Sequence, residues 1–378
     1  MFSRTGILIY GVVLTSLSTL AIDHAKAQGW EEVSNTRLQS VCAGANGFPQ
    51  VLGATGCAAI TVAWSGAIFD SRRDRLIIWG GGHNDYYGNE LYAFNVQSST
   101  IERLNDPGLP TSAGCTESIA NGTQPNSRHT YDGIEYIEAT DEMFVFGGSL
   151  ACGAGDFGSD TWTYDFKANR WQQRSPSGPI PRGDAGMLTA YDPVTGLVYV
   201  HDRQHLYSFD SRNNRYTRLS SSPVSLGYHL AATIDPVRRV FLIVGFDSAA
   251  GSGAVYSYDI DQGSSYAMRR ISTSGGGPVI NAVYPGVDFD KAAGQVVGWS
   301  GNSVNSVFSL DLGKNEWNET AYSGGPVAVG NGTHGRWRYS AASGVFVLAN
   351  RVNDNIFVLR TGAGELVRPN PPASLKSQ

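Results

Sequence analysis

Charged residues are scarce in this chain, and no cluster of basic residues stands out among them. They make up 16% of the 378 residues, with 28 Lys and Arg against 33 Asp and Glu and a net charge of -5. A protein that binds nucleic acid needs a gathered patch of Lys and Arg to contact the phosphates. Nucleic acid is therefore not an expected partner, although a few arginines brought together by the fold could still bind an acidic polymer.

Long apolar runs are also missing, apart from one at the start of the chain. Arg4 precedes an apolar run at residues 7–20, and Ala25-Lys26-Ala27 is a small-x-small sequence typical of signal-peptide cleavage. No later stretch approaches the ~20 apolar residues that a membrane-spanning helix needs. We therefore predict a signal peptide at residues 1–27, a secreted or periplasmic protein and no membrane span. An uncleaved N-terminal anchor is the alternative.

Cysteine is rare as well, because the chain contains only Cys42, Cys57, Cys115 and Cys152. In an exported protein four cysteines most simply form two disulfides, and three pairings are possible. Proximity in the sequence favours Cys42–Cys57 and Cys115–Cys152. None of the four has the Cys-x-x-Cys or His-x-Cys spacing of a metal site. We therefore expect no metal and no other cofactor.

What the chain does contain is a repeat of about 40–50 residues, built from short strands that end in glycines or in Asp and Asn. We count six copies, whose first strands are expected to begin near Trp64, His129, Gly186, His229, Tyr284 and His334. The sixth copy has no fourth strand of its own, and residues 29–33 match the fourth strands of the other copies. Such repeats are typical of a ring of small sheets.

The predicted fold is therefore all-β: a six-bladed propeller at residues 28–365, closed by the N-terminal strand and followed by a polar tail at residues 366–378. Pairing the two ends of the chain in one blade would remove the exposed sheet edges that otherwise invite aggregation. A seventh blade within residues 36–63 or 107–127 is the alternative.

The repeats resemble the kelch repeat of galactose-oxidase-type propellers. The residues that carry the resemblance are Gly80-Gly81, Gly147-Gly148, the Tyr-Asp pairs at 164–165 and 258–259, Trp171 and Trp317. It covers nearly the whole chain after the predicted signal peptide, but repeats three to six lack the glycine pair. Kelch-type propellers include enzymes, lectin-like binders and scaffolds, so the fold alone assigns no function.

Five repeats share a polar residue at the turn after the first strand, namely Asp70, Asp192, Asp235, Asp290 and Ser340. Six residues before these positions stand Trp64, Gly186, His229, Tyr284 and His334. Equivalent positions in a propeller lie at equivalent places around the axis, so the large side chains of this set are expected to surround one opening of the ring. Ordinary packing between blades is the alternative for each of them.

The stretch GGGHNDYYGN at residues 80–89 is the most unusual in the chain. Its glycines allow a sharp turn, which would present His83, Asn84, Asp85 and the two tyrosines toward the second repeat. Further polar side chains precede or follow strands of the next two repeats: Arg128, His129, Arg182, Arg203 and His205.

Several common chemistries find little support. The chain has no Gly-x-Ser-x-Gly for nucleophilic hydrolysis, and its carboxylates stand in turn contexts rather than as an evident pair for glycoside hydrolysis. Copper oxidation of the galactose-oxidase kind requires a cysteine beside a tyrosine, whereas the cysteines here are expected in disulfides.

Histidine, tyrosine and arginine without a carboxylate pair suit β-elimination from a uronate polysaccharide. An arginine neutralises the carboxylate so that the α-proton becomes acidic, and His or Tyr groups remove that proton and protonate the leaving oxygen. The chain is similar to exported propeller lyases that cut ulvan-like uronate polysaccharides. The similarity rests on the propeller, on His83 after the glycines and on Arg128-His129 before the next blade.

This similarity implies His83 and His129 as acid and base, Arg128 or Arg182 as the group that neutralises the carboxylate, and Tyr86 or Tyr87 as a sugar platform or alternative base. The predicted catalytic residues are His83, Tyr87, Arg128, His129, Arg182 and His229. The predicted substrate-binding residues are Asn84, Tyr86, Tyr228, Tyr284, His334 and Arg336.

We thus predict a secreted, monomeric polysaccharide lyase acting on an acidic polysaccharide or another carbohydrate. A non-catalytic propeller that binds carbohydrate or protein is the main alternative, because exposed tyrosines could stack on sugar rings. A sugar epimerase or mutarotase, which opens and recloses a sugar ring with similar acid and base groups, is the third.

Overall fold

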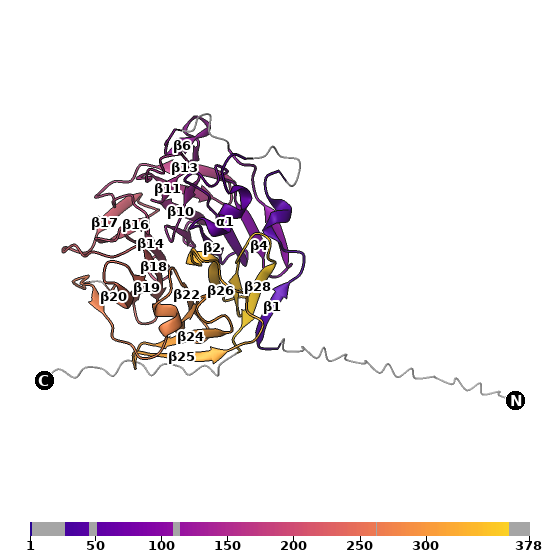
Figure 1. Cartoon of the computed structure of the whole chain (residues 1–378), viewed down its shortest axis with the longest axis vertical. Helices are drawn as coiled ribbons and strands as arrows, with labels where there is room; N and C mark the ends of the chain where they lie inside the picture. Colours follow the sequence, from indigo (N-terminus) through magenta and orange to yellow (C-terminus); the bar gives the residue numbers. More distant parts are fainter. Residues whose placement is uncertain (2–26, 45–50, 109–113, 262, 363–378) are drawn as a thin grey trace.

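Six four-stranded antiparallel sheets form the blades of a closed ring in the computed structural model of the protein (Figure 1). The structure describes residues 1, 27–44, 51–108, 114–261 and 263–362. The predicted signal peptide, apart from its first and last residues, and the predicted polar tail lie outside the described residues. The fold is the predicted all-β, six-bladed propeller.

The blades follow one another in chain order. The first three consist of β2 (Gly66–Asp70), β3 (Arg75–Trp79), β4 (Tyr92–Asn95) and β5 (Thr100–Arg103); β9 (Ile134–Ile137), β10 (Glu142–Phe146), β12 (Thr161–Asp165) and β13 (Arg170–Arg174); and β14 (Leu188–Asp192), β15 (Leu197–His201), β16 (Leu206–Asp210) and β17 (Arg215–Arg218). The next two consist of β18 (His229–Asp235), β19 (Val240–Asp247), β20 (Ser252–Asp259) and β21 (Arg269–Arg270); and β22 (Gly286–Asp290), β23 (Gln295–Trp299), β24 (Ser306–Asp311) and β25 (Glu316–Ala321). The sixth consists of β26 (Trp337–Ser340), β27 (Val345–Leu348), β28 (Ile356–Arg360) and β1 (Gly29–Val33).

Burial explains which strand takes which place in a blade. The innermost strands β2, β9, β14, β18, β22 and β26 contact their neighbours around the axis. The second strands are apolar on both faces because each sheet packs between two others, and β10 (EMFVF) is buried throughout. The outer strands alternate instead: in β13 (RWQQR) and β25 (EWNETA) the tryptophan is buried while most of its neighbours are exposed. Each of these tryptophans anchors the rim of its blade.

The shared turn position fixes the register of the inner strands. Asp192, Asp235 and Asp290 each accept hydrogen bonds from backbone N–H groups two and three residues further on, which closes the turn to the second strand. Asp70 accepts a bond from the Arg73 N–H in the same way, at 3.2 Å. The first and last residues of these turns are paired across the two strands in every blade.

The N-terminal strand closes the ring, as the sequence predicted. All five residues of β1 pair with β28, and Figure 1 shows the indigo strand beside the yellow one. Trp30 packs its ring 5.8 Å from Trp299 and 5.6 Å from Trp337, between the last two blades. The seventh-blade alternative is wrong. The described parts of residues 36–63 and 107–127 contain short helices and one two-stranded hairpin, and the longest of these elements has four residues: η1 (Leu38–Val41), η2 (Gly56–Ala58), α1 (Ala59–Val62), η3 (Ala120–Gly122), β6 (Ser118–Ile119) and β7 (Gln124–Pro125).

The second blade begins later than expected. Its inner strand β9 starts at Ile134, whereas His129 belongs to β8 (Arg128–His129), which pairs with β11 (Ser149–Leu150) in a separate two-stranded sheet. This small sheet brings His129 beside the glycine-rich loop of the first blade.

Both favoured disulfides are present, Cys42–Cys57 and Cys115–Cys152. They are compatible with an extracellular protein, because disulfides persist in oxidising compartments. No helix among the described residues is long and apolar enough to cross a membrane.

A buried ion cluster lies near the axis, among the inner strands. The Arg338 guanidinium pairs with Glu135 at 3.3 Å and donates to the Ala67 carbonyl. Asp132 and Asp288 accept backbone hydrogen bonds close by, and burial raises the pKa of Asp132 to about 8. The cluster ties inner strands from several blades together, and Glu135, Asp288 and Arg338 also line a cavity of about 110 Å³.

Candidate functional site

Five of the six blades are preceded by a residue with positive φ, namely Trp64 (48°), Tyr131 (50°), Gly186 (68°), Tyr284 (47°) and His334 (52°). Four of the five are not glycine, and this conformation costs an ordinary residue roughly 1–2 kcal/mol. Such strain is often retained at ligand sites. The set differs from the sequence register at two places: it includes Tyr131, which the sequence analysis missed, and it lacks His229, whose φ is not positive.

Tyr131 could have been found by counting back from the turn of the second blade, as was done for the other blades. The second blade has Ile137 at the turn position where the other blades have Asp or Ser, and Ile137 pairs with Glu142 as those residues pair with theirs. Six residues before Ile137 stands Tyr131, not His129. In the sequence, the register of each blade could be recognised only from the polar residue at this turn. It could not be recognised in the second blade, where that residue is an isoleucine.

The side chains at these positions form one cluster where the inner strands begin, in which Tyr284 and His334 are each 1% exposed and Tyr131 is 9% exposed. We call it the aromatic mouth and define it by Trp64, His129, Tyr131, His229, Tyr284 and His334. Ring centroids are 4.2 Å apart for Tyr284 and His334, 5.4 Å for His229 and Tyr284, and 6.1 Å for Tyr131 and Tyr284. His129 lies 6.2 Å from Tyr131, edge to face. The structure thus brings together the predicted residues His129, His229, Tyr284 and His334.

Backbone hydrogen bonds hold these strained residues in place. The Tyr131 N–H donates to the Trp64 carbonyl at 2.7 Å, and the Tyr284 N–H donates to the His229 carbonyl at 3.0 Å. Each bond joins two blades. The positions of the aromatic rings are therefore set by the closure of the ring rather than by a flexible loop.

His129 is paired with a carboxylate. Its Nε2 lies 2.9 Å from Asp85 Oδ2, and the carboxylate can only accept, so Nε2 carries the proton and Nδ1 holds a free electron pair. Burial lowers the pKa of His129 to about 4, although Asp85 opposes this shift by favouring the charged form. At neutral pH His129 is therefore an uncharged imidazole whose protonated form a neighbouring carboxylate would stabilise.

The glycine-rich loop holds Asp85 in position. A Cβ on Gly82 (φ 81°) would lie 2.1 Å from the His129 backbone nitrogen, so only glycine lets the loop press against β8. The segment just before Cys57, inside the loop that the first disulfide closes, also holds the glycine-rich loop. The N–H groups of Thr55 and Gly56 donate to the Asp85 carbonyl, and the Thr55 hydroxyl donates to Asp85 Oδ1 at 2.5 Å.

His83 stacks on His129, with ring centroids 5.9 Å apart. Its ring lies on the loop that the second disulfide anchors, because an ideal Cβ on Gly155 would fall 1.9 Å from His83 Cδ2. His83 is half-buried and adopts a positive φ of 42°. The two predicted acid–base histidines therefore lie side by side, with His129 the deeper of the two.

A Gly155→Ala substitution should displace the His83 ring. The methyl group has no room beside Cδ2, and because the His83 ring stacks on His129, its displacement should shift the His129 ring and reduce turnover about tenfold or more. The measurement is the rate of the variant relative to Gly153→Ala in the same loop, where an added Cβ meets nothing within 4 Å. Equal rates in the two variants would show that the position of His83 does not matter.

A cation borders the mouth next to the third blade. The Arg203 guanidinium lies 4.0 Å from the centre of the Tyr228 ring and pairs with Asp184 at 2.5 Å. Gly186 makes this arrangement possible, since a Cβ there would lie 3.0 Å from the Tyr228 carbonyl oxygen and 3.5 Å from Arg203 Cδ. The one blade that lacks a large side chain at the mouth thus has an arginine and an exposed tyrosine beside it.

Arg203 and the mouth interact electrostatically. The charges of Asp184 and Arg203 influence the pKa of Tyr131, which burial raises above its usual value. Burial also raises the pKa of Tyr284 and lowers those of His229 and His334. At neutral pH the mouth therefore holds neutral imidazoles and protonated phenols, with Arg203 as a cation at its border.

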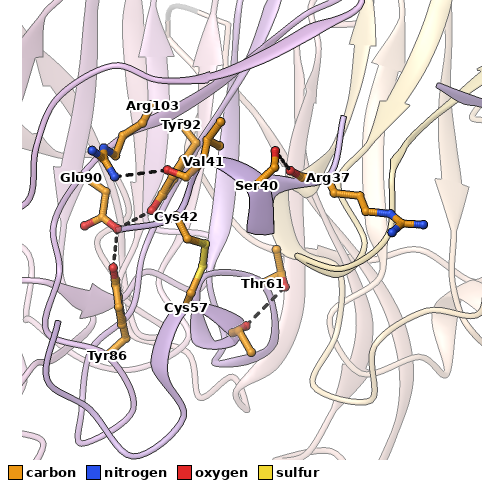
Figure 2. The surroundings of a disulfide bond; sticks show 11 residues. Arg37, Ser40, Val41, Cys42, Cys57, Thr61, Tyr86, Glu90, Tyr92 and Arg103 are labelled. Carbon is orange, nitrogen blue, oxygen red and sulfur yellow. Dashed lines mark hydrogen bonds between the residues drawn. A yellow bond between two sulfur atoms is a disulfide. The ribbon is translucent and has the colours of Figure 1, made fainter. Parts of the chain in front are cut away.

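Three predicted residues lie outside the mouth because they are buried and occupied elsewhere. Arg128 is fully buried and pairs with Asp160 at 2.8 Å. Arg336 donates to four backbone carbonyls, and burial lowers its pKa to about 9. Tyr86 is 2% exposed and donates to Glu90 at 2.5 Å, as does Tyr92; Figure 2 shows both hydroxyls directed at this carboxyl group. These contacts are structural.

The remaining predicted residues lie around the mouth or beside it. Asn84 is exposed on the glycine-rich loop, and Tyr87 is 5% exposed with its hydroxyl 3.4 Å from Asn84 Oδ1. Arg182 is exposed and contacts Asp184 Oδ2, the same carboxylate oxygen that Arg203 contacts. Among the residues that the structure describes, no three His, Cys, Asp or Glu side chains are grouped so that they could hold a metal ion.

Comparison with known families supports the fold but does not identify the chemistry of the aromatic mouth. Residues 66–250 match the family model described as Attractin/LZTR1 beta-propeller. The match runs from β2 past β19, and it includes Asp85, His129 and Arg203. Proteins with a common fold often differ in function. The match and the six-bladed ring together support a kelch-type propeller.

Proposed function

We propose that this protein is a secreted, monomeric lyase that binds a uronate residue of an acidic polysaccharide at the aromatic mouth and cleaves the chain by β-elimination. One observation carries the proposal: an imidazole paired with a carboxylate lies beside a phenol. His129 Nε2 donates to Asp85 Oδ2 at 2.9 Å, and the ring centroids of His129 and Tyr131 are 6.2 Å apart. Burial keeps the imidazole uncharged and the phenol protonated at neutral pH, since it lowers the pKa of His129 to about 4 and raises that of Tyr131.

The roles follow from the protonation states. His129 Nδ1 takes the proton from C5 of the uronate, and the electron pair forms a C4–C5 double bond as the bond from C4 to the linking oxygen breaks. The Tyr131 hydroxyl gives its proton to that oxygen. Asp85, which accepts from Nε2, stabilises the imidazolium, and a proton then passes from the imidazolium to the tyrosinate through solvent.

We assign the neutralisation of the uronate carboxylate to Arg203 and not to Arg128. Its side chain is 13% exposed and lies at the border of the mouth, whereas the Arg128 side chain is 0% exposed. A fixed cation next to the carboxylate lowers the energy of the carbanion-like transition state. Tyr228, which is 42% exposed and stacked against Arg203, offers a face for a sugar ring.

The pH dependence of the rate should follow the lowered pKa of His129. The base is uncharged above its pKa, so kcat/KM should rise with pH around pH 4 and be flat through pH 6.5. Asp85 raises the pKa of His129, so an Asp85→Asn variant should show the rise at a still lower pH and a lower plateau. A rise centred near pH 6.5 in the native protein would rule out His129 as the buried base.

The direct assay is the ultraviolet absorbance of an unsaturated uronate during incubation with a panel of uronate polysaccharides. A rise in absorbance supports the lyase.

A carbohydrate-binding module is the second candidate, because Tyr228 is an exposed aromatic ring beside a cation. In that case a polysaccharide would be retained in affinity electrophoresis without any rise in absorbance, and a Tyr228→Ala variant would lose the retention.

A further inference from the structure

A second cavity lies beside the aromatic mouth, between the fifth and sixth blades. It has a volume of about 250 Å³ and shares Tyr284 with the mouth. Its remaining walls come from the segments 281–283, 300–302, 328–330 and 332–333. The Thr333 N–H donates to the Tyr284 carbonyl at 2.8 Å, so the cavity wall and the mouth are joined through the backbone. The cavity therefore lies directly next to the mouth, on the other side of Tyr284.

No side chain that lines the cavity carries a charge. Arg351 touches the outside of this wall, where it donates to the carbonyls of Val327 and Ala328 and faces Asp354 at 3.8 Å, but it does not line the cavity. A carboxylate placed here would lose hydration without gaining an ion pair, which is unfavourable.

The polar atoms of the cavity favour hydroxyl groups. The Ser300 hydroxyl and Asn302 Nδ2 both donate to the Pro278 carbonyl, at 2.6 and 3.2 Å. The Ser300 hydroxyl hydrogen and one of the two Asn302 side-chain N–H groups are thus engaged on the protein, and the Ser300 oxygen accepts from the Asn302 backbone N–H at 3.3 Å. The second N–H and the Oδ1 of Asn302 remain as an uncharged donor and acceptor, which suit sugar hydroxyls. Ala328 and Val329 supply apolar surface for the face of a ring.

We infer that this cavity is a subsite for an uncharged sugar next to the uronate at the mouth. The inference rests on the proposed function for the position of the uronate, and it names the substrate class. The preferred polymer alternates a uronate with a neutral sugar and is not a run of uronates.

The test is equilibrium binding of two hexasaccharides, one alternating glucuronate with a neutral hexose and one of glucuronate alone. Both are titrated into the His129→Ala protein so that neither is consumed. The alternating compound should bind at least several-fold more tightly. An added Asn302→Arg substitution supplies the missing cation, and it should raise the affinity for the all-glucuronate compound about three- to five-fold, the range of a solvent-exposed ion pair.

Asn318→Arg is the matched control, because Asn318 is exposed on the outer strand β25 of the same blade and the charge change is identical. It should leave the preference unchanged. Equal binding of the two compounds, or the same gain with Asn318→Arg, would overturn the subsite. If the preference and the Asn302→Arg effect are found but the native protein releases no unsaturated product, the subsite stands and the lyase proposal fails. If neither hexasaccharide binds, both fail.

Discussion

A His129→Ala variant should lose turnover by a factor of about 10²–10⁴, the usual contribution of a positioned general base. His129 is the one imidazole of the mouth that the structure pairs with a carboxylate, and its lowered pKa keeps it unprotonated at neutral pH. The measurement is kcat on a uronate polysaccharide, with polysaccharide retention measured on the same protein. Turnover should fall while retention persists, because the sugar-binding surface at Arg203 and Tyr228 is intact.

His205→Ala is the matched control for this variant. His205 is a half-buried histidine near the third blade, 3.4 Å from the Ser220 hydroxyl, and it has no ring contact with the mouth. Its replacement should leave the rate within a small factor of the native value. If the His129 variant retained full activity, or if the two variants lost activity equally, His129 would not be the base.

An Arg203→Ala variant should lower kcat/KM by about 10²–10³, the effect of removing one group that stabilises developing negative charge. The guanidinium pairs with Asp184 and covers one face of Tyr228 at 4.0 Å, so its removal affects both carboxylate neutralisation and the sugar platform. The loss should be smaller on a substrate whose uronate carboxyl groups are methyl esters, because an ester carries no charge to neutralise and still acidifies the C5 proton.

Arg182→Ala provides the comparison, since Arg182 contacts the same Asp184 carboxylate with a side chain that is 53% exposed. We expect a minor change from it. A large loss with Arg182→Ala and none with Arg203→Ala would show that Arg182, as predicted from the sequence, neutralises the carboxylate instead of Arg203.

The fold could be predicted from sequence because every blade repeats the same local chemistry. The Asp carboxylate at the turn accepts hydrogen bonds from backbone N–H groups two or three residues further on, and this fixes the register in four blades. The N-terminal strand was recognisable because the last repeat lacked its fourth strand, and Trp30 fits the place of the tryptophans on the other outer strands.

The site could be predicted only in part, because burial and pairing depend on contacts distant in sequence. Arg128 was expected at the mouth, but its partner Asp160 comes 32 residues later, and nothing near Arg128 in the sequence indicates the pair. Tyr86 and Glu90 are four residues apart, yet their burial arises from packing against the N-terminal segment, as Figure 2 shows around the first disulfide. Tyr131 was missed because Ile137 hides the register of its blade.

The most direct test of the lyase proposal is the mass of the fragments after the protein has acted on a defined uronate oligosaccharide. Elimination splits the chain without adding water, so the masses of the two fragments should sum to the mass of the substrate, and the His129→Ala protein should release neither. Fragments that together exceed the substrate by one water would show hydrolysis. An intact oligosaccharide that remains bound would show a binding propeller, and either result would contradict the lyase proposal.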